Sequence, residues 1–141
     1  MRRHPLIPEL HTVAQVAKQA GVGVTAVRYY EREGLVAPVK RTAANYRLYA
    51  TEAVARIRFT RRAQQLGFTL AEIKELLSLR LRGGQRCADF RSAAAAKIAD
   101  LEERIRSLRQ MSRALAKLAD ECEAYPAGDG CPLLEYLEGE L

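Results

Sequence analysis

Apolar residues recur every three or four positions in two short stretches near the start of the chain. Thr12 and Gln15 form a capping box at the first stretch, which predicts a helix that ends at Gly21. The second stretch begins after Gly23 and stops at Gly34, and it predicts another short helix. Two short helices joined by a tight glycine turn predict a helix-turn-helix.

The periodicity then changes from helical to alternating. A polar turn over residues 42–45 is followed by alternation over residues 46–50, with Arg47 and Tyr49 on the side opposite Leu48. This alternation predicts a small β-hairpin, or wing, after the helix-turn-helix.

Two more helices are expected after the wing. Thr51 is the expected cap of a third helix that ends at Gly67, and Thr69 with Glu72 forms a capping box for a fourth that ends at Gly83. The first half of the chain is therefore predicted to be a compact, mostly helical unit.

The second half of the chain carries one long helical pattern. From Cys87 to Cys122 there is no proline or glycine, and at about 1.5 Å per residue such a helix would run roughly 50 Å. Its apolar residues form a narrow seam flanked by charge: Ile98, Leu101, Ile105, Leu108, Met111, Leu115 and Leu118. Because so narrow a seam on so long a helix needs a partner helix, we expect a second copy of the chain to supply it. The alternative is a helix that folds back on the first unit.

The charges divide at the same place as the helical patterns. The chain has 141 residues and a formal net charge of +6. Residues 1–86 hold 16 Lys and Arg against 6 Asp and Glu, whereas residues 87–141 hold 7 against 11. A basic first half favours a polyanion partner, since each phosphate that Lys or Arg neutralises releases counterions.

The location of the protein is predicted from what its sequence lacks. It has no run of about twenty apolar residues and no apolar segment behind Arg2 and Arg3, so neither a membrane span nor a secretion signal is expected. Its three cysteines are an odd number, which favours reduced thiols over complete pairing. We therefore expect a cytoplasmic protein whose residues 1–10 form a loose arm.

The second helix of a helix-turn-helix enters the major groove of DNA, where its early outward-facing residues contact base edges or phosphates. Thr25, Arg28 and Tyr29 are the candidates here, and Arg28 suits either a guanine or a phosphate. The alternative for Arg28 is a local ion pair with Glu31 or Glu33 on its own helix. The wing adds four candidates for contacts with the DNA backbone: Lys40, Arg41, Arg47 and Tyr49.

The chain resembles the MerR family of bacterial transcription regulators in three segments that occur in the family's order. These segments are TVAQVAKQAGVGVTAVRYYEREGL, NYRLY and RFTRRAQQLGFTLAEIKELL. The resemblance covers nearly the whole chain and implies a mostly all-α fold. Residues 1–10 would be a loose arm, and 11–82 a winged helix-turn-helix DNA-binding domain with connecting helices. Residues 83–121 would form a long antiparallel coiled-coil dimerisation helix, and 122–141 a metal-binding loop with a final helical turn.

The same resemblance implies a way of working. Family members bind promoters in which the spacer between the two polymerase-recognition elements is too long. They repress without effector, and with it they bend and untwist the DNA so that RNA polymerase engages both elements. A homodimer would place two reading heads on the halves of a near-palindromic operator. A ligand that stabilises one protein state can meet the cost of deforming the DNA.

The three cysteines, Cys87, Cys122 and Cys131, cannot meet within one chain if the long helix is continuous, because roughly 50 Å separates the first two. In the antiparallel helix pair that the resemblance implies, the start of one helix lies beside the end of the other. Cys87 of one copy is then expected beside Cys122 and Cys131 of the other, which makes two identical sites per dimer.

Three thiolates favour a soft metal ion. Cys131 precedes Pro132 at a helix start, where free amide groups favour the thiolate, whereas Cys122 lies at the negative end of the long helix and needs a cation. Hg(II), Pb(II) and Cd(II) suit three sulfur ligands better than Zn(II), which usually takes four ligands, and Cu(I) would leave Cys87 unexplained. Oxygen ligands for Pb(II) or Cd(II) are also available nearby: Glu121, Glu123 and Asp129.

The order of the cysteines and the segment CPLLEYL resemble the mercury-responsive members of the family. This resemblance implies that Cys87, Cys122 and Cys131 bind one Hg(II) in a trigonal plane, with two ligands from one subunit and one from the other. It also implies control of a mercury-resistance operon. Lead and cadmium sensors of the family use three cysteines as well, so a regulator that responds to Pb(II), Cd(II) or Zn(II) is the alternative.

Functions of other classes have less support in the sequence. A catalytic cysteine needs a nearby base, and the two histidines, His4 and His11, lie far from all three cysteines, so an enzyme is not expected. A thiol redox sensor built on Cys122 and Cys131 leaves Cys87 without a role, and a metal-sequestering protein has no use for a helix-turn-helix. The remaining alternative is three incidental buried thiols.

Overall fold

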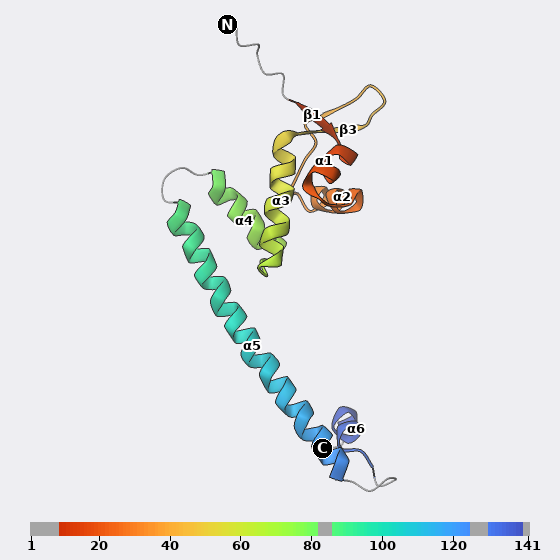
Figure 1. Ribbon diagram of the computed structural model, residues 1–141, viewed down its shortest axis with the longest axis vertical. Coiled ribbons are helices and arrows are strands. Elements are labelled where there is room, and N and C mark those ends of the chain that lie inside the picture. The colour runs from red at the N-terminus through yellow and green to blue at the C-terminus, as the bar shows by residue number, and fades with distance from the viewer. Residues whose placement is uncertain (1–8, 82–85, 125–129, 140–141) are drawn as a thin grey trace. The chain divides into compact units, whose positions relative to one another are not determined.

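The computed structural model describes residues 9–81, 86–124 and 130–139 of the chain. The chain divides into two compact units, Met1–Ala93 and Ala94–Leu141. The described residues form six helices and three short strands, which confirms the predicted mostly helical fold (Figure 1).

The first two helices are α1 (Val13–Ala20) and α2 (Val24–Arg32). The predicted capping box is present, since the Gln15 backbone N–H donates to Thr12 Oγ1 at 3.3 Å and the Thr12 backbone N–H donates to Gln15 Oε1 at 2.8 Å. Gly21 ends α1 in the left-handed region at φ 72°, a conformation that glycine adopts without steric cost. The helix-turn-helix is therefore as the spacing of apolar residues predicts.

The wing belongs to a three-stranded antiparallel sheet in the order β1-β3-β2. Its strands are β1 (Leu10–Thr12), β2 (Lys40–Arg41) and β3 (Arg47–Ala50). The predicted hairpin is confirmed, but β1 is an addition, because Leu10 pairs with Ala50 instead of belonging to a loose arm. Residues 1–8 of the expected arm lie outside the described residues.

Two longer helices follow, α3 (Thr51–Gln65) and α4 (Leu70–Leu81). The prediction that Thr51 caps α3 is wrong: Ala50 holds the cap position, and the Thr51 hydroxyl lies 3.1 Å from His11 Nε2. The capping box before α4 is confirmed by hydrogen bonds of 2.9 and 3.2 Å between Thr69 and Glu72.

One apolar core holds the helices of this unit together. In Figure 1, α1 and α2 lie beside α3, and the sheet lies near the start of α3. Each helix from α1 to α4 contributes a fully buried aliphatic side chain, as does the segment after α2: Val16, Val27, Ile57, Ile73 and Leu35. Burying one such side chain contributes about 1.5–3 kcal/mol, so this core fixes how α2 is presented.

Helix α5 (Arg86–Ala124) is continuous, and α6 (Pro132–Glu138) lies against its last turns (Figure 1). The apolar seam of α5 is exposed, with Ile98 at 58%, Leu108 at 62%, Met111 at 57% and Leu115 at 57% of their maximal exposure. No helix of the described residues is long and apolar enough to cross a membrane.

The core assignment is tested by Ile57→Ala, which removes a fully buried side chain from the middle of α3. We expect the free energy of unfolding to fall by about 2–5 kcal/mol, because the lost contacts leave a cavity. Urea denaturation at one fixed protein concentration measures this change. The matched control is Gln65→Ala at an exposed position of the same helix, which should change the value by less than about 0.5 kcal/mol. Equal losses for the two variants would contradict the assignment.

Candidate nucleic-acid interface and cysteine site

Helix α2 turns one face to the core and another to solvent. Val27 and Tyr30 are buried, and the Tyr30 hydroxyl donates to Gln64 Oε1 on α3 at 2.8 Å. Thr25, Arg28 and Tyr29 are exposed on the other face. The three residues predicted to contact DNA from α2 are thus all available to a ligand.

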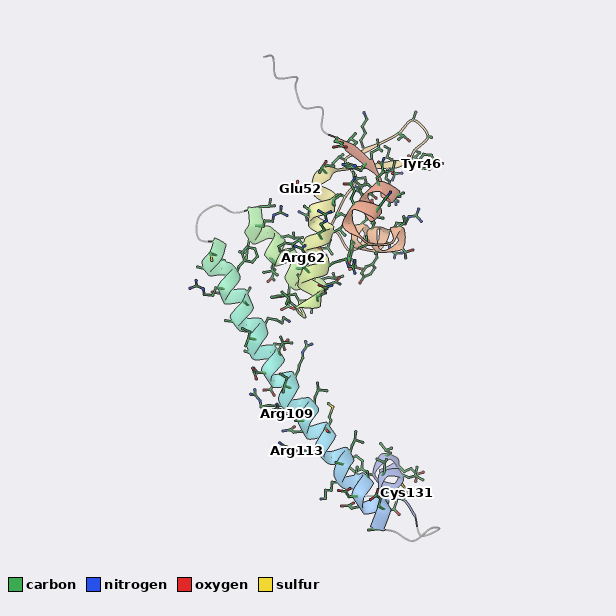
Figure 2. All side chains as sticks on the ribbon, in the orientation of Figure 1. Tyr46, Glu52, Arg62, Arg109, Arg113 and Cys131 are labelled. Atoms are coloured by element: carbon green, nitrogen blue, oxygen red, sulfur yellow. The ribbon has the colours of Figure 1, made fainter. Side chains whose placement is uncertain are left out.

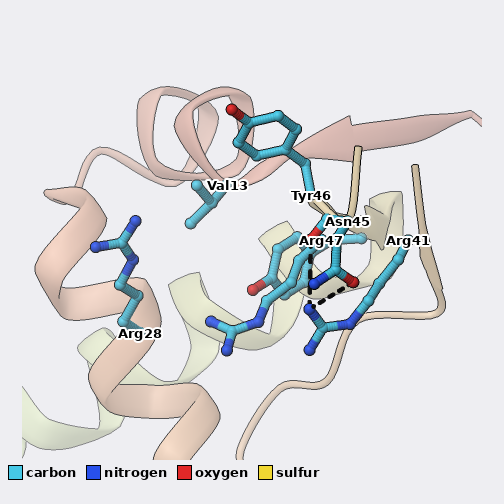
Figure 3. Close-up of a pocket in the computed structure, with 7 residues that line it drawn as sticks. Val13, Arg28, Arg41, Asn45, Tyr46 and Arg47 are labelled. Carbon is cyan, nitrogen blue, oxygen red and sulfur yellow. Dashed lines mark hydrogen bonds between the residues drawn. The ribbon is translucent and has the colours of Figure 1, made fainter. Parts of the chain in front are cut away.

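A shallow hollow of about 250 Å³ opens between α2 and the wing. Figure 3 shows that Arg28 approaches this hollow from α2, whereas Arg41 and Arg47 approach it from the wing. Four further residues complete its lining: Val13, Asn45, Tyr46 and Tyr49. Three guanidinium groups around one hollow suit a phosphate, because arginine presents several N–H donors in a fixed fork.

The turn of the wing contributes residues that the sequence did not single out. Asn45 adopts a left-handed backbone conformation at φ 68°, and both its backbone oxygen and its Oδ1 accept from Arg41 at 3.3 Å. Tyr46 is 70% exposed at the rim of the hollow. The available signal was the asparagine in the polar turn, since asparagine tolerates this conformation better than most residues.

Glu31 connects α2 to the wing. Its Oε2 lies 3.0 Å from Arg47 Nη1, and its Oε1 accepts from the Tyr49 hydroxyl at 3.1 Å. The expected alternative, a pair between Arg28 and Glu31, is not formed, and Arg28 has no hydrogen bond or ion pair with any residue that the structure describes.

Tyr49 needs a correction as a candidate DNA contact. Its side chain is fully buried and its hydroxyl is bonded to Glu31, so it cannot reach a DNA backbone directly. Burial raises the pKa of Tyr49, and the hydrogen bond to Glu31 raises this pKa further. Tyr49 is buried, whereas Arg47, two positions earlier on the same face of β3, is exposed.

The other two basic candidates of the wing, Lys40 and Arg41, are exposed on β2. Arg41 lines the hollow, whereas Lys40 lies outside its lining. Arg58 and Arg61 on α3 instead donate to the backbone oxygens of Gln19 and Gly21, at 2.6 and 2.7 Å. These two arginines therefore hold the end of α1 in place.

The second site lies in the other unit, where α6 meets α5. Cys122 is in the last turn of α5. Cys131, which Figure 2 labels, precedes the first residue of α6. Their Sγ atoms lie 3.2 Å apart, which is a hydrogen-bonding distance and not the ~2 Å of a disulfide. Both side chains are half-buried.

The start of α6 favours the thiolate of Cys131. The backbone N–H of Leu134 lowers the pKa of the Cys131 thiol most, and the hydrogen bond from Cys122 lowers it further. Together they outweigh the partial burial of the sulfur and the nearby Glu135 carboxylate, which raise this pKa. The net pKa of Cys131 therefore lies below its ordinary value.

Cys122 has the opposite balance. The backbone N–H of Leu133 lowers the pKa of the Cys122 thiol, but the hydrogen bond to Cys131 and partial burial raise it. The negative charges at Cys131 and Glu121 add to this rise, so the net pKa of Cys122 lies above its ordinary value. The two hydrogen-bonded thiols therefore have pKa values shifted in opposite directions.

Cys87 is exposed in the first turn of α5. At about 1.5 Å per residue, the helix separates it from Cys122 by roughly 50 Å. Among residues 9–81, 86–124 and 130–139 of one chain, no three His, Cys, Asp or Glu side chains form a group that could hold a metal. Of the expected oxygen ligands, Glu121 and Glu123 are exposed near the end of α5, and Asp129 lies outside the described residues.

A winged helix-turn-helix with a hollow lined by arginines is typical of DNA-binding regulatory proteins. Comparison with known proteins agrees: residues 11–79 match the family described as MerR HTH family regulatory protein, and residues 54–118 match MerR, DNA binding. The chain belongs to the MerR family of transcription regulators, which bind DNA and are not enzymes.

The relatives include a protein of Rhizobium meliloti named heavy metal-dependent transcription regulator 2, which is 38% identical over 89% of this chain and 84% of that protein. The HTH-type transcriptional regulator HmrR of Sinorhizobium medicae is 40% identical over 128 residues, which are 89% of this chain and 84% of that protein. The regulator PbrR691 of Ralstonia metallidurans, solved in complex with lead(II), has a TM-score of 0.76 and 33% identity over 89% of this chain and 97% of that one. The dual function regulator MerR of Bacillus megaterium was solved with mercury(II). It has a TM-score of 0.67 and 34% identity to this chain, and the match covers 86% of this chain and 94% of that one.

The interface is tested by Arg28→Ala. We expect the affinity for a duplex selected by the wild-type protein to fall about 10- to 100-fold, because a base or phosphate contact from α2 is lost. Fluorescence anisotropy at fixed salt concentration measures this affinity. Lys74→Ala is the matched control, since it removes the same charge from an exposed position of α4 that does not line the hollow. An affinity equal to that of the control would mean that α2 is misassigned.

The proton distribution between the two cysteines is tested by alkylation. With reductant and a chelator present, iodoacetamide should modify Cys131 at lower pH than Cys122, because the thiolate is the nucleophile and the pKa of Cys131 is lowered while that of Cys122 is raised. Mass spectrometry of peptides across a pH series measures both rates. In urea the two rates should converge, and identical pH profiles in the folded protein would contradict the assignment.

Proposed function

We propose that this protein is a mercury(II)-responsive regulator that binds promoter DNA as a homodimer. The single observation that carries the metal site is the 3.2 Å separation of the Cys122 and Cys131 sulfurs at the end of α5. Two soft thiol ligands at this distance supply most of the donor set that Hg(II) prefers. Cys87 of a second chain supplies the third.

The exposed seam of α5 supports the homodimer. Its aliphatic residues follow a spacing of three and four, and several are more than half exposed in the single chain. An antiparallel pair of α5 helices buries this seam and brings the start of one helix to the end of the other. Each dimer then has two identical sites, each with Cys122 and Cys131 from one chain and Cys87 from its partner.

The choice of Hg(II) rests on the ligand set and the relatives. Three sulfurs with no histidine suit Hg(II), and one relative has been solved with mercury(II). Another, with a TM-score of 0.76, has been solved with lead(II), so a regulator that responds to Pb(II), Cd(II) or Zn(II) is the second candidate. Glu121 and Glu123 beside the thiols favour this candidate for the harder of these ions.

DNA binding uses the surface between α2 and the wing. Arg28, Arg41 and Arg47 bind phosphates or a guanine, with Thr25, Tyr29 and Lys40 beside them. Without metal the dimer represses its promoter, and with metal it distorts the DNA so that RNA polymerase engages both promoter elements. The metal can drive this change only if it binds the distorting state of the dimer more tightly.

A thiol redox sensor is the candidate of another class. It is favoured by the same 3.2 Å distance, because a disulfide between Cys122 and Cys131 needs only a small approach of the sulfurs. It gives Cys87 no function, which separates it from the metal sensor.

Titration of the reduced dimer with Hg(II) tests the metal site, with ultraviolet thiolate–metal absorption and transcription measured together. We expect one Hg(II) per chain and a transcriptional response that Cys87→Ser abolishes, because the third ligand is lost. Ala88→Ser, at the adjacent exposed position of α5, is the matched control and should leave the response intact. Parallel titrations with Pb(II) and Cd(II) rank the metals. A Cys87→Ser variant that responds normally would favour the redox sensor and remove the site shared between chains.

Mixed dimers test whether the site is shared between chains. A chain with Cys87→Ser is combined with one that carries both Cys122→Ser and Cys131→Ser. Each homodimer lacks complete sites, whereas the heterodimer regains one. Absence of Hg(II) binding in the heterodimer would contradict the antiparallel arrangement.

A further inference from the structure

A carboxylate lies beside the hollow that is lined by Arg28, Arg41 and Arg47. Glu31 sits one helical turn after Arg28 on α2, and its side chain is only 15% exposed. Three arginines surround the neighbouring hollow. The negative charge of Glu31 weakens the attraction of this surface for a polyanion. We therefore expect the contacts of Glu31 to serve a role that offsets this loss.

The contacts of Glu31 identify that role. Its two carboxylate oxygens bind two different residues of β3, Arg47 at 3.0 Å and the Tyr49 hydroxyl at 3.1 Å. Arg47 and Tyr49 are two positions apart on one strand and so lie on the same face of it. Both oxygens of one side chain therefore hold the wing to α2.

The two residues that bind Glu31, Tyr49 and Arg47, differ in their exposure to solvent. Tyr49 is fully buried and fixes the carboxylate from the core side. Arg47 has 42% of its side chain exposed and lines the hollow together with Arg28. Glu31 thus fixes the position of Arg47 relative to Arg28, which lies on the same helix as Glu31.

The geometry points to Glu31 as a positioning residue that sets the spacing between the guanidinium groups of Arg47 and Arg28, and so favours specific over non-specific DNA binding. The role rests on the DNA binding proposed above. Without the carboxylate, Arg47 is repelled by Arg28 and Arg41 and can occupy many rotamers. Its charge still attracts any phosphate, but its position no longer matches one register of the duplex.

The test compares Glu31→Gln with Glu33→Gln. Both variants remove one negative charge near the end of α2, but the Glu33 side chain is exposed and has no hydrogen bond or ion pair with the described residues. The probes are a duplex selected from a random pool by the wild-type protein and a shuffled duplex of the same length and composition. Affinities for both are measured over a series of salt concentrations.

Glu33→Gln should raise the two affinities slightly and equally, because it changes only the net charge. Glu31→Gln should raise the affinity for the shuffled duplex in the same way but lower that for the selected duplex, so that the ratio of the two falls about 5- to 10-fold. Loss of charge alone predicts no such fall. A ratio equal to that of Glu33→Gln would overturn the proposal.

Thermal denaturation reveals whether Glu31→Gln folds. If it does not fold, Tyr49→Phe takes its place in the test. This variant retains the Glu31 charge and the aromatic ring but removes one of the two groups that hold the carboxylate. The specificity ratio should fall in the same direction by a smaller factor, and an unchanged ratio would overturn the proposal. If the wild-type protein itself does not distinguish the two duplexes, then the DNA-binding function fails and not the role of Glu31.

Discussion

The length and the exposed seam of α5 constrain everything that the protein can do with its cysteines. Leu108, near the middle of the seam, is 62% exposed, and apolar surface left in water forgoes about 25 cal/mol per Å². A second copy of α5 relieves this cost along the seam. Because the helix spans roughly 50 Å between Cys87 and Cys122, the same association is also the simplest way for those sulfurs to meet. In the proposed homodimer, the metal site therefore depends on the association of the two α5 helices.

The cysteine pair at the end of α5 is electrostatically uneven. Backbone N–H groups of α6 lower the pKa of Cys131, whereas the hydrogen bond to Cys131, partial burial and nearby negative charges raise the pKa of Cys122. A soft divalent ion that binds both sulfurs displaces the protons they hold, and the charge of the ion then stabilises two neighbouring thiolates. Proton release makes binding to this pair stronger as the pH rises.

Local signals predicted most of the fold, and long-range pairing explains the failures. The capping boxes of Thr12 and Thr69 involve residues three apart, so their sequence patterns are sufficient. Strand β1 has only three residues and pairs with β3 far along the chain, which no periodicity reveals. Alternation in the wing puts Arg47 and Tyr49 on one face but does not show that only Tyr49 is buried, so Tyr49 was misplaced. The sulfur pair was within reach of sequence reasoning because its loop is short, whereas the role of Glu31 depends on β3.

The rigidity of the first unit determines how a distant metal could act on DNA. One core joins α1 to α4, and Glu31 fixes the wing to α2, so the reading surface resists internal deformation. A packed core of this kind moves as a body. In the proposed regulator, an effector at the end of α5 therefore acts on the DNA by changing the relative placement of the two copies of the first unit, and not by reshaping either copy. In the proposed dimer each metal site joins two chains, so metal binding acts on the placement of one chain's first unit relative to that of the other chain.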